Sequence, residues 1–86
     1  MSDLPALAKQ NKKEEIVVLL RQGANVNEQN ECGQTAFWWS CFYNDTETAE
    51  ILLKNNNINV NLRDNYGISP FYYACGDNSY AIVSLS

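Results

Sequence analysis

Short motifs recur along this sequence at an interval of roughly 33 residues, and a period of that size is the strongest constraint on its fold. The pair Leu19-Leu20 recurs as Leu52-Leu53. The triplet Asn25-Val26-Asn27 recurs as Asn59-Val60-Asn61. Self-similarity at such a period is typical of stacked repeat proteins, so we expect one small repeat domain over residues 1–86.

Within each unit, the apolar residues predict two short helices separated by a turn. In the first unit Leu4, Leu7 and Ala8 lie on one helical face, because their spacings are those of successive helical turns. A polar stretch over 10–13 follows, and a second apolar helix comes after it. That helix should end near Gly23, since a helix C-terminus favours a glycine in the left-handed conformation.

Helix start signals mark the second and third units. Thr35 and Thr46 can each cap a helix, and Ser69-Pro70 combines a capping residue with a proline at the first helical position. The segments 25–34 and 59–68 between the helix pairs alternate apolar with polar residues and contain Asn, Asp and Gly. They are too polar for helices and predict extended arms around a tight turn.

The composition excludes several classes of function. Lys and Arg number 6 against 10 Asp and Glu, so the net charge is −4, whereas nucleic acids and anionic membranes attract clustered positive charge. The chain contains no His, which is the commonest general base and a frequent metal ligand. Its four Gly stand too far apart for a phosphate-binding loop. We therefore expect no enzyme, cofactor or metal site, and no contact with nucleic acid or membrane.

The cysteines predict thiols rather than disulfides. Cys32, Cys41 and Cys75 give an odd count without a Cys-x-x-Cys pair. Cys41 and Cys75 occupy equivalent positions, and equivalent helices should pack about 8–10 Å apart, too far for a disulfide. We expect both in the core. A reducing compartment fits this pattern, and no cationic-then-apolar leader follows Met1, so we expect an intracellular, cytoplasmic location.

Two stretches resemble the signature of the ankyrin repeat, Thr-Pro-Leu-His-x-Ala. They are residues 35–41, Thr-Ala-Phe-Trp-Trp-Ser-Cys, and residues 69–75, Ser-Pro-Phe-Tyr-Tyr-Ala-Cys. The run 23–27, Gly-Ala-Asn-Val-Asn, resembles the end of that family's unit. The resemblance implies an all-α, ankyrin-type α-solenoid of helix-turn-helix repeats with short β-hairpin-like connecting loops. Its units would be a capping-like N-terminal repeat (1–29), a second repeat (30–63) and an incomplete third (64–86).

The sequence departs from the family pattern at three places. Trp38 and Tyr72 replace the signature His, and an indole cannot copy both hydrogen bonds of an imidazole. Ala36 replaces the signature Pro in the second unit. At the other end, an apolar last helix over 82–85 has no polar cap, which solenoid ends need. We expect either further repeats or a partner to cover that end.

The resemblance implies a partner protein bound on the concave face, which consists of the loop tips and the adjoining first helices. Lys9 and Gln10 are the matching helix positions in the first unit. The contact positions in the later units map onto Glu31, Cys32, Gln34, Trp39, Phe42, Tyr43, Asn65, Tyr66, Ile68 and Asp77. Because the whole net charge of −4 falls in residues 30–86, an acidic groove could steer a partner with a basic surface.

The aromatic residues divide into a core set and a surface set. We expect the core to take Phe37, Trp38, Phe71 and Tyr72. Consecutive helical residues point about 100° apart, so Trp38 and Trp39 should not share one face. We therefore expect one of the two to be partly exposed, and Trp39 to lie on the floor of the groove.

Two other functions stay open at this stage. The chain could be a structural segment of a larger ankyrin array or assembly. It could also be an acidic inhibitor that occludes a basic site on a partner, and salt-sensitive association would favour that alternative.

Overall fold

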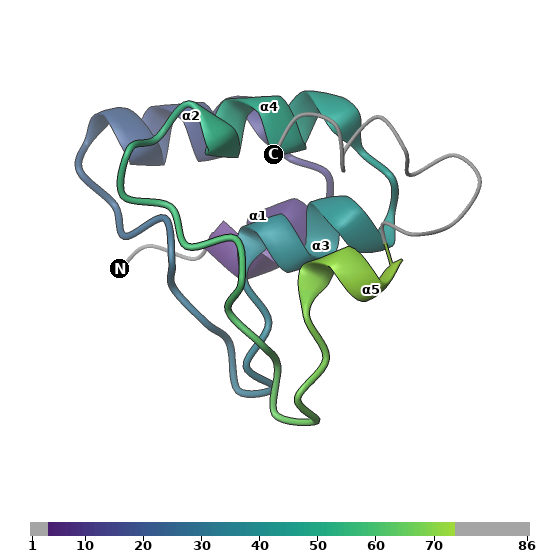
Figure 1. Ribbon diagram of the computed structural model, residues 1–86. Helices are drawn as coiled ribbons and strands as arrows, with labels where there is room; N and C mark the ends of the chain where they lie inside the picture. The colour runs from purple at the N-terminus through teal and green to yellow at the C-terminus, as the bar shows by residue number, and fades with distance from the viewer. Residues whose placement is uncertain (1–3, 74–86) are drawn as a thin grey trace.

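The computed structural model describes residues 4–73 of the 86-residue chain, in which five helices and no strand are present. Figure 1 shows two layers, with α2 and α4 side by side in one and α1, α3 and α5 in the other. The connecting loops extend past the second layer and end in adjacent tips (Figure 1). The helices are α1 (Leu4–Lys9), α2 (Lys13–Arg21), α3 (Ala36–Phe42), α4 (Thr46–Leu53) and α5 (Pro70–Tyr73).

Two of the three predicted helix starts are confirmed, and one shifts to the preceding residue. Thr35 caps α3 by accepting a 3.0 Å hydrogen bond from the backbone N–H of Trp38, and α5 begins at Pro70. The prediction that Thr46 caps α4 is wrong, because Asp45 is the N-cap. The Asp45 carboxylate accepts bonds from both the backbone N–H and the hydroxyl of Thr48, a pair of contacts that a threonine at 46 could not make from inside the helix.

The turn between the two helices of a repeat is built in the same way in both complete units. Asn11 follows α1 with φ of 61°, and Asn44 follows α3 with φ of 55°. Asparagine is the residue other than glycine that adopts this left-handed conformation most readily. Gly23 after α2 has φ of 89°, which confirms the predicted left-handed end of that helix.

The core lies between the two layers and extends under the loops. The predicted apolar residues Leu4, Ile16, Phe37, Ala49 and Leu52 are all essentially inaccessible to solvent. Cys41 is 1% exposed, which confirms a buried thiol there. The predicted core position of Tyr72 is wrong, since its side chain is 69% exposed. Tyr72 belongs to the short helix α5, on which its side chain points mainly to solvent.

The connecting loops contain no strand in the described part of the chain, yet each is closed as a tight hairpin-like turn. In the first loop the N–H of Asn30 donates to the carbonyl of Gln34, and in the second Asp64 donates to Ile68. The side-chain oxygens of Asn30 and Asp64 also accept N–H groups from further along their own turns. The same set of hydrogen bonds thus recurs one period later, so the two loops share their turn geometry as well as their sequence pattern.

The second loop lies against the first at Gly33. The N–H of Asn65 donates to the carbonyl of Cys32 at 2.8 Å, and its side-chain amide donates to the carbonyl of Glu31 at 2.6 Å. A Cβ placed on Gly33 would come within 2.6 Å of the Asn65 side chain and 2.8 Å of its backbone nitrogen. Glycine is therefore required at this position both for its φ of 79° and for the close approach of the next loop.

Several predictions fall on residues outside the described range: the positions of Cys75 and Asp77, the apolar helix over 82–85, and the side chain of Phe71. The division of the chain into units 1–29, 30–63 and 64–86 stays a prediction.

Candidate functional site

The exposed residues of the loop tips come from both loops and lie at the end of the molecule distant from α2 and α4 (Figure 1). Glu31 and Cys32 are exposed on the first tip, and Asn65 and Tyr66 on the second. The side chain of Tyr66 is 85% exposed. Gln34 and Ile68, which close the two turns, are half-buried. The predicted tip residues are thus brought together on one surface, except that Gln34 and Ile68 contribute only part of their side chains.

The predicted contact residues on α3 differ from one another in their exposure to solvent. Phe42 and Tyr43, at the C-terminal end of α3, are close to half-exposed. The expectation of a partly exposed tryptophan is wrong, because Trp38 is 4% and Trp39 is 9% exposed. The reason is that α3 packs against α1, α4 and α5 at once, so side chains that point about 100° apart both meet other residues.

Trp39 belongs to the core cluster, and three neighbouring side chains cover its ring. The ammonium group of Lys9 on α1 lies 5.4 Å from the centroid of the Trp39 ring, within the range of a cation–π contact. Tyr43 stacks on Trp39 with ring centroids 5.6 Å apart, and Phe42 meets it edge-on at 5.5 Å. The Trp39 ring is therefore covered by the side chains of Lys9, Phe42 and Tyr43, which are themselves accessible to solvent.

These aromatic rings form a continuous cluster along α3. Trp38 stacks on Phe42 with an interplanar angle of 12°, and Phe42 meets Tyr43 edge-on. The spacing of Trp38 from Phe42, and of Trp39 from Tyr43, places these rings on neighbouring turns of the helix. Each aromatic pair contributes about 0.5–1.5 kcal/mol beyond area burial, so the exposed rings are held in fixed positions.

The indole nitrogen of Trp39 is buried, and within residues 4–73 it has no hydrogen-bond acceptor. An unpaired buried donor costs about 1–3 kcal/mol. The contacts of the ring with Lys9, Phe42 and Tyr43 offset part of this cost.

The charged residues of the second unit lie mostly away from this surface. Asp45 and Glu47 pair with Lys13, at 3.3 Å and 3.4 Å from its ammonium nitrogen, and α3 itself carries no charged residue. The carboxylate of Asp64 is used within its own turn. The described residues of α3 and its C-terminal end carry aromatic side chains without charge, whereas the loops carry Glu31, Arg63 and Asp64.

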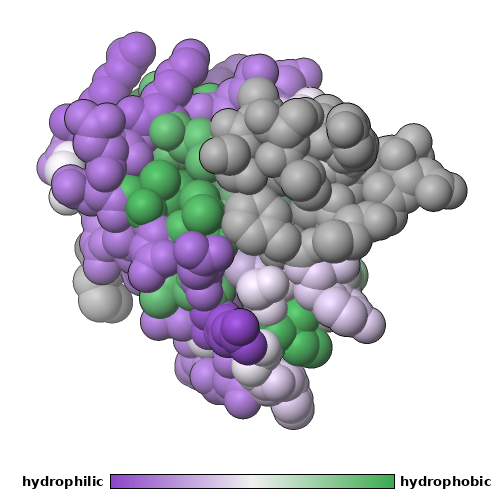
Figure 2. Space-filling model, viewed as in Figure 1, coloured by the Kyte–Doolittle hydropathy of each residue, from purple (hydrophilic) through white to green (hydrophobic). Residues whose placement is uncertain are grey.

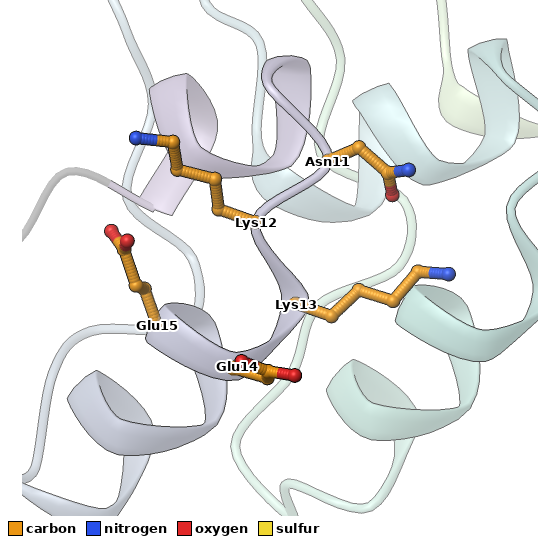
Figure 3. Close-up of a pocket in the computed structure, with 5 residues that line it drawn as sticks. All are labelled: Asn11, Lys12, Lys13, Glu14 and Glu15. Atoms are coloured by element: carbon orange, nitrogen blue, oxygen red, sulfur yellow. The ribbon is translucent and has the colours of Figure 1, made fainter.

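The Lys13–Asp45 contact joins the first repeat to the second. Figure 3 shows Lys13 extending from the start of α2 toward α4, while Lys12 and Glu15 extend to the other side of the turn. Partial burial raises the pKa of the Asp45 carboxyl, but hydrogen bonds from Thr48 and Lys13 outweigh it, so the pKa lies below its usual value. For Lys13, desolvation lowers the pKa, and its two carboxylate partners more than reverse this.

Cys32 is exposed and Cys41 is buried, and neither forms a disulfide. Burial raises the pKa of the Cys41 thiol to about 12, so this thiol is protonated and inert at neutral pH. Within residues 4–73, no group of three or more Cys, Asp or Glu residues is arranged so that it could hold a metal ion. Figure 2 shows a mostly hydrophilic face with a patch of apolar residues between the helix layer and the loops. None of the described helices has the length and apolar character needed to cross a bilayer.

The sequence pattern did not predict the side chains that join the two loops. Asn27 and Gln29 of the first loop donate to backbone carbonyls of the second, at 2.8 Å and 3.1 Å. The available signal was the recurrence of Asn27 as Asn61, a polar residue repeated at a fixed place in each unit.

Comparison with known families gives a match over almost the whole chain. Residues 6–85 match the family model for ankyrin repeats, which comprises three copies of the repeat. No match to a curated protein was found. The match confirms the resemblance drawn from residues 23–27, 35–41 and 69–75, and with it the all-α, ankyrin-type fold.

Proposed function

Because the chain belongs to the ankyrin-repeat family, whose members generally act as protein–protein interaction modules, we propose that it binds a partner protein through its concave face. We define this face by the exposed side chains of the two loop tips and of the C-terminal end of α3. The described residues that form it are Glu31, Cys32, Phe42, Tyr43, Asn65 and Tyr66.

The observation that carries this proposal is the exposure of Phe42, Tyr43 and Tyr66. Their side chains are 45%, 49% and 85% exposed, although large aromatic side chains gain about 1.5–3 kcal/mol when they are fully buried. Tyrosine is enriched among the residues that dominate protein interfaces. Rings already fixed by stacking on Trp38 and Trp39 lose little conformational freedom on binding, which favours affinity.

The proposed mechanism is shape complementarity without catalysis, and ankyrin repeats are typically non-catalytic. The partner would place apolar or aromatic side chains on Phe42 and Tyr43. The net charge of −4 would add long-range attraction to a basic partner, but this contribution would come from the whole molecule rather than from the face itself. The reduced thiols Cys32 and Cys41 suit an intracellular, cytoplasmic setting for this interaction.

A pair of variants tests the concave face at two exposed rings. Tyr43→Ala and Tyr66→Ala each remove an exposed ring, whereas a Trp39 substitution would open a cavity. A protein captured from the source lysate by the wild type would be identified, and its affinity for each variant measured by calorimetry. We expect each substitution to weaken binding about tenfold or more.

Val18→Ala is the matched control, because Val18 is half-exposed on α2 in the other layer. It should leave the affinity unchanged, and circular dichroism should show that all variants are folded. A partner that binds the Tyr43→Ala/Tyr66→Ala double variant as tightly as the wild type would contradict the proposal.

A further inference from the structure

A groove lies between α2 and α4, the two helices that run side by side in the layer away from the loop tips (Figure 1). It encloses about 340 Å³, which is at the lower end of the range for small-ligand pockets and suits one or two side chains. We call it the α2–α4 groove. Both helices that form its walls lie within the described residues, and its lining side chains are Val17, Leu20, Arg21, Ile51, Lys54 and Asn55.

The middle of the groove is apolar and is held in place by the core beneath it. Val17, Leu20 and Ile51 are each half-buried. Leu20 and Ile51 pack against the core cluster with part of their surface, and the rest of that surface lines the groove. An apolar side chain placed there would remove the remaining surface from water, which the hydrophobic effect favours in proportion to the area. The middle of the groove is therefore suited to an apolar side chain.

The two ends of this helix pair differ in charge. At the N-terminal ends, Lys13 of α2 pairs with Glu47 of α4 at 3.4 Å, and Figure 3 shows Lys13 extending toward α4. At the opposite ends, the exposed side chains of Arg21 and Lys54 are the last residue of α2 and the C-cap of α4. Neither of them forms an ion pair within residues 4–73. Opposite charges thus bridge one end, whereas the other end presents two positive charges.

Asn55 adds a third donor beside these two charges. Its side-chain oxygen accepts a hydrogen bond from the N–H of Asn57 at 2.9 Å, which fixes the orientation of the carboxamide. Its NH₂ group donates to no acceptor in the described range. Arginine and lysine side chains are also donors without acceptor capacity, so the side chains at this end of the groove offer N–H groups alone. A carboxylate, which only accepts, is the protein group that complements them.

The helix ends explain part of this charge pattern. A basic residue near a helix C-terminus interacts favourably with the helix dipole, and Arg21 and Lys54 occupy equivalent positions one period apart. That interaction requires neither the apolar surface beside them nor the donor of Asn55. The combination of apolar surface with unpaired donors, in a protein of net charge −4, indicates an occupant that is both apolar and acidic.

We propose that the α2–α4 groove binds a segment of a partner protein in which an apolar side chain such as leucine lies next to acidic residues. The apolar side chain would lie on Val17 and Ile51, and the carboxylates would accept hydrogen bonds from Arg21 and Lys54. Charge complementarity supports this occupant, because an acidic segment is attracted to these two charges and repelled by a molecule whose net charge is −4. An inorganic anion would leave the apolar surface exposed, and an uncharged segment would leave the donors without acceptors.

The α2–α4 groove and the concave face lie in different layers of the molecule. The concave face presents aromatic rings of α3 and the loop tips, whereas the groove presents aliphatic and basic side chains of α2 and α4. The two proposals rest on different residues, so failure of one leaves the other standing.

A peptide of matching chemistry tests the groove. The blocked peptide Ser-Asp-Glu-Leu-Leu-Glu-Asp-Ser has acidic residues on both sides of its leucines, so either chain direction is covered. It would be titrated into the isotope-labelled 86-residue protein and followed by NMR. We expect saturable shifts of the backbone N–H signals of Leu20 and Ile51 and of the side-chain signals of Asn55, while those of Tyr43 and Tyr66 stay in place. The affinity should fall as the salt concentration rises.

Removal of charge at the groove should weaken peptide binding. Lys54→Gln should raise the dissociation constant about threefold and Arg21→Gln/Lys54→Gln about tenfold, because each exposed ion pair contributes modestly. Lys12→Gln is the matched control, since it removes the same charge from an exposed lysine on the other side of the α1–α2 turn (Figure 3). It should bind like the wild type. Circular dichroism checks that each variant is folded, because basic residues at helix ends also stabilise their helices.

Five results would overturn the proposal. The first is the absence of saturable shifts in the groove, and the second is equal loss of affinity in Lys12→Gln and Lys54→Gln. Equal binding of a peptide with Asn and Gln in place of its acidic residues would show an apolar site that does not recognise charge. The same shifts with inorganic phosphate alone would show an anion site only. Self-association that depends on Lys54 would make a second copy of the chain the occupant.

Discussion

Lys13 at the start of α2 reaches Asp45, the N-cap of α4, with 3.3 Å between its ammonium nitrogen and a carboxylate oxygen. Asp45 therefore serves two purposes, because it caps its own helix and ties the second repeat to the first. The equivalent cap position in the first repeat is Lys12, whose side chain makes no capping bond. One carboxylate thus contributes both to the cap of α4 and to the contact between the two repeats.

Two substitutions at Asp45 should distinguish what its helix cap contributes to stability from what its negative charge contributes. Asp45→Ala removes both and should lower the free energy of unfolding by about 1–2 kcal/mol, whereas Asp45→Asn keeps a good capping residue and should cost less. Urea denaturation at neutral pH measures both. Equal losses for the two variants would show that the cap contributes nothing at this position.

The pH dependence of stability should follow the same carboxylate. Because the folded-state pKa of Asp45 is lowered, its contribution is present above the usual pKa of about 3.8 and is lost as the pH falls through the folded value. We expect the free energy of unfolding of the wild type to fall more steeply than that of Asp45→Asn below about pH 4. Acid titrations of the two proteins would be followed by circular dichroism. Loss of stability with the same dependence on pH in both proteins would argue against this assignment.

Gly33 and Gly67 provide a matched pair, because both have a left-handed φ, 79° and 77°, at the same place in their loops. An added Cβ at Gly67 meets nothing within 4 Å, while at Gly33 it collides with Asn65. Gly67→Ala should therefore cost only the backbone strain of about 1–2 kcal/mol. Gly33→Ala should cost about 1–3 kcal/mol more, since the second loop must move away. Thermal unfolding measures the difference, and equal costs would mean that the loops are not held together.

The thiols should differ sharply in reactivity. Cys32 is exposed, whereas burial raises the pKa of Cys41 to about 12. In a Cys75→Ser background, a thiol reagent at mildly alkaline pH should modify Cys32 rapidly and Cys41 only after unfolding in denaturant. Rapid modification of Cys41 in the folded protein, detected by mass spectrometry of its peptides, would contradict its burial.

Substitution by glycine should change stability differently at the two turns that contain Asn11 and Asn44. Both Asn11 and Asn44 have a positive φ, but the side-chain oxygen of Asn44 is buried without a hydrogen-bond donor within residues 4–73, whereas Asn11 is exposed. Asn11→Gly should be nearly neutral, because relief of strain offsets the greater freedom of the unfolded chain. Asn44→Gly should be stabilising by about 1 kcal/mol, since it also removes the unpaired oxygen. Denaturant midpoints of the two variants compare the effects directly.

Much of the fold could be predicted because its signals are local and repeated. The period of the recurring motifs indicated the arrangement of units, and Thr35, Pro70 and Gly23 marked helix ends through the conformations that these residues favour. The cap of α4 was assigned to the neighbouring position, because Asp45 and Thr46 are both good capping residues and only the contacts with Thr48 decide between them.

The surface was harder to predict, because burial there depends on distant neighbours. Trp39 is buried because α3 packs against three other helices at once and Lys9 of α1 lies over its ring, and the periodicity of α3 alone does not predict these contacts. Tyr72 is exposed on the short helix α5, and its place in the sequence pattern did not predict this. The loop-to-loop bonds of Asn27 and Gln29 likewise join residues of two units, whereas sequence patterns describe one unit at a time.

The bonds between the loops also bear on how the chain acquires its structure. Each of them joins residues 30 to 34 positions apart, so closing the second loop onto the first requires a segment of about one repeat. The entropy of closing a segment grows only slowly with its length, and contacts between neighbouring units keep the contact order low. Folding can therefore proceed unit by unit, and a chain emerging from the ribosome can fix its first loop as soon as the second has been synthesised.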